Sequence, residues 1–438
     1  MIQATNLSKS KLRPPVGYIT MINQFSIMIL ELDCNIQLSL MSITNEVWVN
    51  GFVDISLNTS TLSYYSYKYL WTHLLCLVAI HNKAKISFLF ALIAAFAIAN
   101  GSATKEEVGI YELKKGDLSV KFTNWGATIV QVVLPDKYGK LGDIALGYDS
   151  VQEYMNDTSY VGSIVGRVAN RIAGAQFTLK GVHYKLIPNE GKNMLHGGPI
   201  GFSDVVWKVE KYKKDGHAPS IVFAYDSYDG EQGFPGALKV TVAYTLLPGN
   251  KLTVTMKANA LNKATPVNLA QHTYWNLGNH NSGDILSEEV QIFASQYTPV
   301  DSQLIPTGEF ASVKGTPYDF LKSHTVGSRI NKLPSGYDIN YVLDGAPGKI
   351  KKVAVVKDKK SGRVMELLTN QPGVQFYTAN FLKDVKGKGG YVYQPHGALC
   401  LETQGFPDSV NHPNFPSTII YPGKEYKHIM LFKFSISS

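Results

Sequence analysis

Two residues with acid–base side chains stand inside strand-like stretches of this 438-residue chain. Glu402 lies in the run Ala-Leu-Cys-Leu-Glu-Thr, where an ionised carboxylate is costly to bury unless it is paired or hydrogen-bonded. His272 lies in "NLAQHTYWNLGNH", crowded by aromatic and amide side chains. Strand alternation equally allows Glu402 to face solvent, and a lone His in a strand is usually structural. A carboxylate and an imidazole that meet in the fold would suit general acid–base catalysis.

Four further residues have side chains that suit a hydroxyl-rich ligand. His196 stands beside two glycines, which let backbone approach a ligand closely, although a turn with a bystander His fits equally. Asn170 and Arg171 offer an amide and a forked guanidinium for sugar hydroxyls, but Arg171 also suits a structural ion pair. Asp338 is the last residue of a turn-like "SGYD", and Asp is a common turn former. Each residue alone is as readily structural as functional.

Taken together, the candidates indicate proton transfer on a neutral, hydroxyl-rich ligand. Aromatic residues stand near them in sequence, namely Tyr274, Trp275 and Phe406. The sequence contains no nucleophilic Ser elbow and no Gly-rich phosphate loop. Its three cysteines have no metal-ligand spacing, so we expect no metal. The net charge of +8 is a mild excess without a block of like charges, which argues against a nucleic-acid partner.

The elements that would carry these residues are strands. From about Glu106 onward, apolar residues recur with period two, as in "KLTVTMKANAL". A Pro-Gly-Asn turn before that run predicts one hairpin, and "DKKSGR" predicts another. "SVQEYMND" is a candidate for one short helix, and strands do not alternate with long amphipathic helices, which argues against a βαβ architecture. We therefore predict an all-β fold, a large antiparallel β-sandwich, over residues 105–438.

The N-terminal part of the chain is a different kind of sequence. Residues 1–82 lack regular periodicity, and residues 83–103 combine Lys83 and Lys85, an apolar run and small residues, which is the pattern of a signal peptide. The run is shorter than the ~20 residues of a membrane span, so no stable span is expected. Such a signal belongs at an N-terminus. One explanation is that residues 1–82 are absent from the natural product, for example through a wrongly chosen start codon. A second is a signal-anchor with a long cytoplasmic tail, and a third is that the apolar run is a buried helix of an unusual extension. We favour the first.

If the segment acts as a signal, the body is secreted; the alternative is a cytoplasmic protein. A secreted body makes Asn156, in the triplet "NDT", a candidate glycosylation site, although such triplets are common by chance.

Six motifs carry a resemblance to a known family. "GRVANRI", "NMLHGG", "QHTYWNL", "GYDIN", "QPGVQFYTAN" and "LETQGFPDSVNHPNFPS" occur in this order across residues 166–416. Together they closely resemble the aldose 1-epimerase (galactose mutarotase) family, over nearly all of residues 105–438 and none of residues 1–85. The resemblance implies a β-sandwich of the galactose mutarotase type that holds the sugar in a cleft over one sheet. It also implies interconversion of the α and β anomers of free aldohexoses such as glucose and galactose.

The resemblance further implies roles for individual residues. His272 would be the general acid and Glu402 the general base. The sugar-binding residues would be Asn170, Arg171, His196, Thr273, Tyr274, Asp338 and Gln375. One departure from the family is visible. Relatives often read Asp-His-Asn where this chain reads Asp338-Ile339-Asn340, so the Asp is retained and the His is missing. If that His contacts the sugar in relatives, the affinity of this protein for sugar could differ.

The implied mechanism needs one base, one acid and no cofactor. Glu402 takes the proton of the anomeric hydroxyl, and His272 donates a proton to the ring oxygen. The ring opens to the aldehyde, C1 turns about the C1–C2 bond, and the ring closes on the opposite face. We expect Glu402 to be ionised at neutral pH, and a nearby carboxylate, from Asp338 or Glu402, to raise the pKa of His272. The partner is a small aldose, and the protein is expected to be a monomer or a weak dimer.

Two alternatives remain at this point. A hexose-phosphate mutarotase needs several Arg or Lys residues at the cleft, and the motifs supply only Arg171, with Arg167 close in sequence. A non-catalytic carbohydrate-binding protein would be expected to lack the acid or the base, and both are present.

Overall fold

The computed structural model describes residues 106–437, so the predicted extension (1–82) and hydrophobic segment (83–103) lie outside the described residues. The described chain consists almost entirely of antiparallel strands, which confirms the all-β prediction. Its one α-helix, α4 (Val151–Met155), lies in the stretch predicted to be helical and begins with a capping box between Ser150 and Glu153. No helix in this range is long and apolar enough to cross a membrane.

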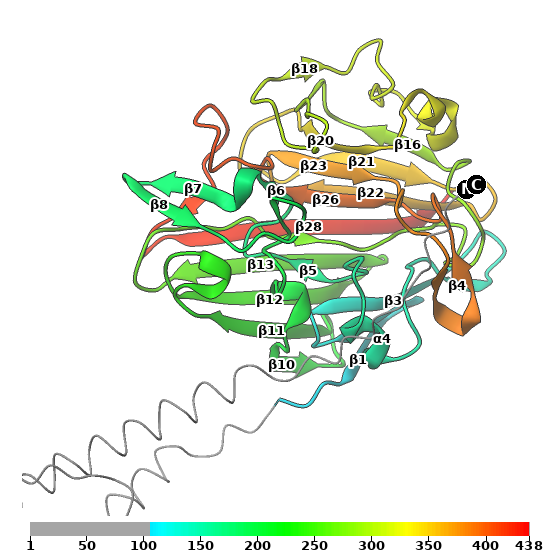
Figure 1. Ribbon diagram of the computed structural model, residues 1–438. Helices are drawn as coiled ribbons and strands as arrows, with labels where there is room; N and C mark the ends of the chain where they lie inside the picture. The colour runs from blue at the N-terminus through cyan, green and yellow to red at the C-terminus, as the bar shows by residue number, and fades with distance from the viewer. Residues whose placement is uncertain (1–105, 438) are drawn as a thin grey trace, which may run out of the picture. The chain divides into compact units, whose positions relative to one another are not determined.

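The largest sheet contains nine antiparallel strands. At its centre β28 (Glu425–Ile436), the long red strand of Figure 1, pairs with β13 (Lys251–Ala260) and β22 (Arg363–Thr369). The two predicted hairpins are both present and join β12 (Leu238–Leu247) to β13 and β21 (Lys351–Lys357) to β22. The other strands of this sheet are β10 (Lys208–Lys213), β11 (Ser220–Ser227), β16 (Glu289–Ile292) and β19 (His324–Thr325).

Two smaller sheets complete the sandwich. One has the order β1 (Ile110–Lys115), β2 (Leu118–Thr123), β3 (Thr128–Pro135) and β4 (Leu141–Asp143). The other has the order β18 (Ala311–Ser312), β17 (Gln296–Tyr297), β20 (Asp338–Val342), β23 (Gly373–Tyr377) and β26 (Cys400–Gln404). One buried cluster contains side chains of all three sheets, such as Phe122, Val254 and Phe376. The sheets therefore share a single core, as expected for a large sandwich.

The five-stranded sheet is buried on both faces at the strands that matter for function. Ile339, Phe376 and Leu401, on β20, β23 and β26, point into the shared core. Because side chains alternate along a strand, their neighbours Asp338, Gln375, Glu402 and others point to the opposite face. Every residue of β23 and β26 is nevertheless buried, because loops cover that second face. This covered face is where polar side chains gather.

Short antiparallel strand pairs connect the covering loops by hydrogen bonds. β5 (Ile164–Val165) pairs with β15 (Ala270–Gln271), which directly precedes His272, and β6 (Arg171–Ile172) pairs with β9 (Met194–Leu195), which directly precedes His196. The remaining pairs are β7 (Gln176–Leu179) with β8 (Val182–Lys185), β14 (Thr265–Pro266) with β27 (Ile419–Ile420), and β24 (Val385–Lys386) with β25 (Val392–Tyr393).

Candidate active site

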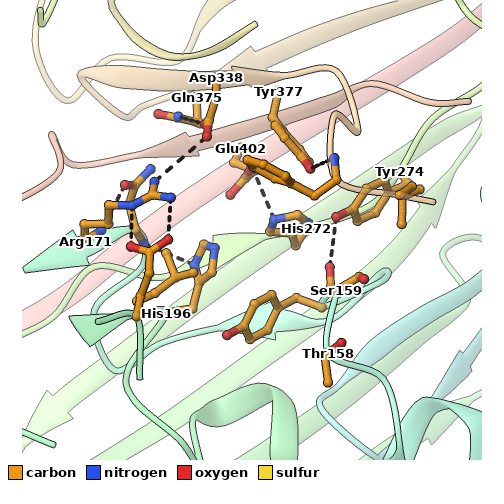
Figure 2. Close-up of a pocket in the computed structure, with 16 residues that line it drawn as sticks. Thr158, Ser159, Arg171, His196, His272, Tyr274, Asp338, Gln375, Tyr377 and Glu402 are labelled. Carbon is orange, nitrogen blue, oxygen red and sulfur yellow. Dashed lines mark hydrogen bonds and ion pairs between the residues drawn. The ribbon is translucent and has the colours of Figure 1, made fainter. Parts of the chain in front are cut away.

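A cavity of about 160 Å³ opens over the covered face of the five-stranded sheet. Figure 2 shows side chains from the sheet and from the covering loops converging on it. All the residues predicted to act on or bind the sugar line this cavity, apart from Thr273: they are Asn170, Arg171, His196, His272, Tyr274, Asp338, Gln375 and Glu402. Residues scattered over more than two hundred positions of the chain are thus brought to one place.

The strand register builds the floor of the cavity. Glu402 on β26 lies directly opposite Gln375 on β23, which lies opposite Asn340 on β20. Asp338 and Tyr377 form the next cross-strand pair on the same face. Side chains directly opposite each other on one face of antiparallel strands are in contact range. This register explains why Glu402 is not on a solvent face, the alternative that alternation alone left open.

His272 and Glu402 lie next to each other although no local sequence signal links them. His272 Nε2 is 3.5 Å from Glu402 Oε1, and the two side chains are 5% and 2% exposed. The backbone of His272 is fixed from both sides, since its N–H donates to the carbonyl of Ser163 and its carbonyl accepts from Gly162. Glu402 Oε2 is buried and has no hydrogen-bond partner among the described residues. A buried acceptor of that kind is normally satisfied, and a ligand hydroxyl can satisfy it.

The charges of this pair differ from the sequence-based expectation. Burial lowers the pKa of His272 to about 4. Burial, with the charge of Asp338, raises the pKa of Glu402 well above its ordinary value, against the opposing effect of Arg171. Both shifts favour the uncharged forms, because a low-dielectric site disfavours an isolated charge. Both shifts run opposite to the expectation of an ionised Glu402 beside a His272 whose pKa a carboxylate raises, and Asp338 contacts Gln375 and Arg171 instead.

His196 is presented to the cavity as a hydrogen-bond donor. Its Nδ1 accepts the backbone N–H of Asn170 at 3.2 Å, so the proton of the neutral ring resides on Nε2. Both residues have a positive φ, 51° and 61°, a sparsely populated conformation that clusters at functional sites. Their backbones also bond to each other, since His196 N–H donates to Asn170 O at 3.0 Å.

The sequence suggested that the two glycines after His196 let the backbone approach a ligand. The structure gives them a different role. A Cβ on Gly197 would lie 2.0 Å from the carbonyl oxygen of Gly166, so glycine is needed there for the chain to pack against itself. Neither Gly197 nor Gly198 lines the cavity.

A second polar group surrounds Arg171. Its guanidinium forms a bidentate ion pair with Glu190, with Nε–Oε2 at 2.6 Å and Nη2–Oε1 at 2.7 Å. Its Nη1 lies 4.0 Å from Asp338 Oδ2. Gln375 Nε2 donates to Asp338 Oδ1 at 2.6 Å, which ties this group to the strand floor. Arg171 is therefore both lining the cavity and ion-paired, the two interpretations that its sequence position allowed.

The residues after His272 divide between cavity and core. Tyr274 lines the cavity and donates its hydroxyl proton to the carbonyl of Ser159 at 2.9 Å. Thr273 is buried away from the lining, and its N–H donates to Gln271 Oε1. Asn276 fixes the following turn, because its amide donates to the carbonyls of Gly283 and Gly397.

Several lining residues were not predicted from the sequence. Tyr377 was detectable, because it is two positions after Gln375 on one strand and must share its face. Leu195 belongs to the two-residue strand β9, which is too short to show alternation. The others come from loops: Thr158, Ser159, Tyr160, Glu190, Phe381 and Leu382. Tyr160 packs edge-on against His196, with ring centroids 4.7 Å apart, and closes the wall beside both imidazoles.

The cavity's donor set suits hydroxyl groups better than a cation. Ligand-type atoms of His196, His272 and Glu402 lie within 4.8 Å of one another, which makes them the metal candidate of the described chain. However, the hydrogen bond from Asn170 leaves His196 Nε2 protonated, so the nitrogen facing the cavity has no lone pair for an ion. What the three residues offer is a proton donor and an acid–base pair.

Comparison with known proteins gives this arrangement a family. The sequence profile of the family described as aldose 1-epimerase matches residues 109–433. A galactose mutarotase of Bos taurus is 44% identical over 339 residues, covering 77% of this chain and 96% of that protein. An aldose 1-epimerase of Escherichia coli is 35% identical over 323 residues, covering 72% of this chain and 91% of that protein.

Solved structures agree with the fold. The aldose epimerase homologue from C. elegans superimposes with a TM-score of 0.71 at 29% identity, over 76% of this chain and all of that one. A galactose 1-epimerase from Lactobacillus acidophilus shares the fold with a TM-score of 0.65 at 24% identity, over 76% of this chain and 99% of that one. With its sandwich, its motif order and its matched span, this chain belongs to the aldose 1-epimerase family.

Proposed function

We propose that the protein is an aldose mutarotase that interconverts the α and β anomers of free aldohexoses such as galactose and glucose. The observation that carries the proposal is the 3.5 Å contact between His272 Nε2 and Glu402 Oε1 at the floor of a small cavity. Relatives named galactose mutarotase and aldose 1-epimerase support the same activity.

The proton count of the pair fits this reaction. A neutral imidazole beside a protonated carboxyl carries one acidic proton, and so does an imidazolium beside a carboxylate. The two forms differ only by transfer of that proton between His272 and Glu402, so no proton need be exchanged with solvent to reach the reactive form. The charge of Arg171, which opposes the raised pKa of Glu402, favours the carboxylate. Sugar hydroxyls that bond to Glu402 Oε2 would favour it further, since hydrogen bonds to a charged form stabilise that form.

The chemistry then proceeds by two coordinated proton transfers. Glu402 takes the proton from the anomeric oxygen while His272 gives its proton to the ring oxygen, and the bond between C1 and the ring oxygen breaks. Rotation about C1–C2 presents the other face of the aldehyde. On closure the ring oxygen attacks C1, its proton returns to His272, and Glu402 returns the proton to the anomeric oxygen. Substrate and protein recover their protons.

The cations near the cavity favour a neutral sugar over a phosphorylated one. Arg167, the second Arg of the motif region, is 2% exposed and donates to the carbonyls of Tyr228, Pro235 and Gly236. It is therefore engaged inside the protein and not available to a phosphate. Arg171 lines the cavity but is paired with Glu190. A purely carbohydrate-binding role is disfavoured because acid and base lie in contact.

Polarimetry tests the proposal. Fresh α-galactose and α-glucose should reach their equilibrium rotation faster with the protein, in proportion to its concentration, than in buffer alone. No acceleration of either sugar, with the protein shown by calorimetry to bind them, would identify a binding protein instead.

We further propose that residues 83–103 direct secretion and that Asn156 then carries a glycan. Asn156 is exposed at the end of α4, where an oligosaccharide has room. N-terminal sequencing and intact mass of the native protein test both points: cleavage near Ala103 supports secretion, and a protein that retains residues 83–103 contradicts it.

A further inference from the structure

Arg171 is the cavity's fixed positive charge, and its pairing is asymmetric. Glu190 occupies both donors of the Nε and Nη2 edge and leaves Nη1 toward Asp338. Burial on its own lowers the pKa of Arg171, but the bond to Glu190 and the charges of Asp338, Glu190 and Glu402 outweigh it and raise the pKa. The guanidinium therefore stays charged while two carboxylates neutralise it.

A second cavity adjoins the first on the side of this ion pair. It measures about 330 Å³ and shares Arg171, Glu190 and Phe381 with the catalytic cavity. Its remaining lining is Gly191, Lys192, Asn193, Ser302, Gln303 and Leu304. Lys192 is exposed and forms no ion pair with any described residue. Glu190 thus lies in a cavity that also holds two cationic side chains.

The tight turn that carries Glu190 and Lys192 is fixed. Glu190 and Asn193 exchange two backbone hydrogen bonds, of 3.1 and 2.9 Å. The side chain of Asn193 accepts the N–H of Gly174 at 2.9 Å, next to the strand that carries Arg171. The geometry of Glu190 relative to Arg171 is therefore part of the folded structure rather than a chance surface contact.

We infer that Glu190 is a specificity-determining residue that excludes anionic sugars, such as sugar phosphates and uronic acids. Its carboxylate occupies the bidentate edge of Arg171 that a phosphate or carboxylate group would otherwise bind. It also adds a negative charge to the cavity that Arg171 and Lys192 line, so an incoming anion would meet repulsion as well as a blocked donor. The inference rests on the proposed function, because it says which aldoses the same site accepts: neutral sugars and not anionic ones.

Replacing Glu190 by Gln should convert the second cavity into an anion site. Gln keeps the size of the side chain but has no charge and only one acceptor oxygen, so it cannot form the bidentate ion pair and leaves donors of Arg171 and the charge of Lys192 available to an oxyanion. With sulfate as the probe, isothermal calorimetry of Glu190→Gln should give binding at least about tenfold tighter than that of the wild-type protein, which is the size expected for new charge-assisted hydrogen bonds. Sulfate should also inhibit α-galactose mutarotation competitively in this variant.

Two controls separate a local effect from a change in net charge. Glu210→Gln removes a carboxylate that is also ion-paired and has the same 36% side-chain exposure, but lies outside both cavities, so its sulfate affinity should equal that of wild type. Glu190→Gln combined with Lys192→Ala should lose most of the gained affinity. Glu190→Ala provides the same test if the Gln variant does not fold.

The inference is overturned if wild type binds sulfate as tightly as Glu190→Gln, or if Glu190→Gln and Glu210→Gln bind it equally. Calorimetry does not require turnover, so this result is independent of whether wild type accelerates mutarotation, which tests the proposed function separately.

Discussion

Glu402 Oε1 faces Nε2 of His272 at 3.5 Å, with the imidazole held between two side chains of one strand. Cys400, two positions before Glu402 on β26, places its Sγ 3.8 Å from the other ring nitrogen, Nδ1. Residues two apart on a strand share a face, so a single strand supplies the partner for each edge of the ring. The acid and the base of the proposed reaction are therefore aligned by the regular geometry of the sheet.

Removing either member of the pair should abolish most of the catalysis. Glu402→Gln and His272→Asn each keep the approximate size of the side chain but remove one proton-transfer group, so we expect kcat for α-galactose to fall by about 10²–10⁴-fold. Polarimetry at several substrate concentrations separates kcat from KM.

Matched controls exist in the core of the same domain. Glu288 is a buried carboxyl that accepts the N–H of Leu277, and His428 is a buried imidazole bonded to Thr403. Neither lines the cavity. Glu288→Gln and His428→Asn should therefore keep kcat near the wild-type value. Wild-type rates in both cavity variants would refute the assignment of acid and base.

The pH profile should be broad and displaced from that of isolated side chains. The reactive pair holds one proton. A second proton is added only as the pH falls toward the pKa of His272, about 4, and activity is lost there. The single proton is lost only when the pH rises through the raised pKa of Glu402. Between these limits kcat/KM should be flat.

Unperturbed groups give a different curve. With reference pKa values of about 4.3 for Glu and about 6.5 for His, activity would already be declining by pH 7. A measured kcat/KM from pH 4 to 9 distinguishes the two cases, and a profile that falls by half near pH 6.5 would contradict burial as the dominant influence on the pair.

The thiol of Cys400 should determine which nitrogen of the His272 ring carries the proton, without raising the pKa of the ring. Burial raises the pKa of this thiol well above its ordinary value, so it remains S–H. The Nδ1–H of neutral His272 can donate weakly to the sulfur of this thiol, which leaves the lone pair on Nε2, the nitrogen that faces Glu402 and accepts its proton. Cys400→Ala should lower kcat by about 2–10-fold, the effect of one weak hydrogen bond, with KM unchanged. Cys400→Ser should restore most of the loss.

The control for Cys400 is the neighbouring residue on the opposite face of β26. Leu401 points into the shared core, so Leu401→Val perturbs packing of the same strand without touching His272. If Leu401→Val changes kcat as much as Cys400→Ala does, the effect of Cys400 is one of packing and not of proton placement. NMR titration of the His272 ring in both variants gives an independent measurement.

The strands of this domain could be predicted, and most of the site could not be predicted from pattern alone. Leu252 and Val254 alternate with polar residues because one face of β13 is in the core, and that periodicity is visible in sequence. The surroundings of Glu402 cannot be predicted from periodicity. Its strand alternates in the same way, but both faces are buried, and what covers the second face is a set of loops that periodicity does not describe.

The protonation states of His272 and Glu402 could not be predicted from the sequence for the same reason. Desolvation depends on every atom around His272, whereas a list of nearby charges names only possible partners. The order of six motifs was needed to associate His272 with Glu402. Glu190, which no motif included, appears only once the turn 190–193 is folded against Arg171.

Gln404 should control the orientation of a binding residue without touching the sugar itself. It is fully buried, and its amide nitrogen lies 3.2 Å from Asn340 Oδ1 and 3.4 Å from Gln375 Oε1. Because both contacts are donated by Gln404, Gln375 must present its own amide nitrogen to Asp338. Gln404→Leu removes the donor and leaves buried acceptors unpaired, which costs about 1–3 kcal/mol and should raise KM for galactose by roughly tenfold with a smaller change in kcat.

Thr403 provides the comparison for Gln404, since it is equally buried, lies one residue away and points to the opposite face, where it bonds to His428 at 2.7 Å. Thr403→Val should lower thermal stability yet leave KM at the wild-type value. If Thr403→Val and Gln404→Leu raise KM to the same extent, distortion of β26 explains both. A raised KM confined to Gln404→Leu means that the amide network sets the geometry with which Gln375 and Asp338 meet the sugar.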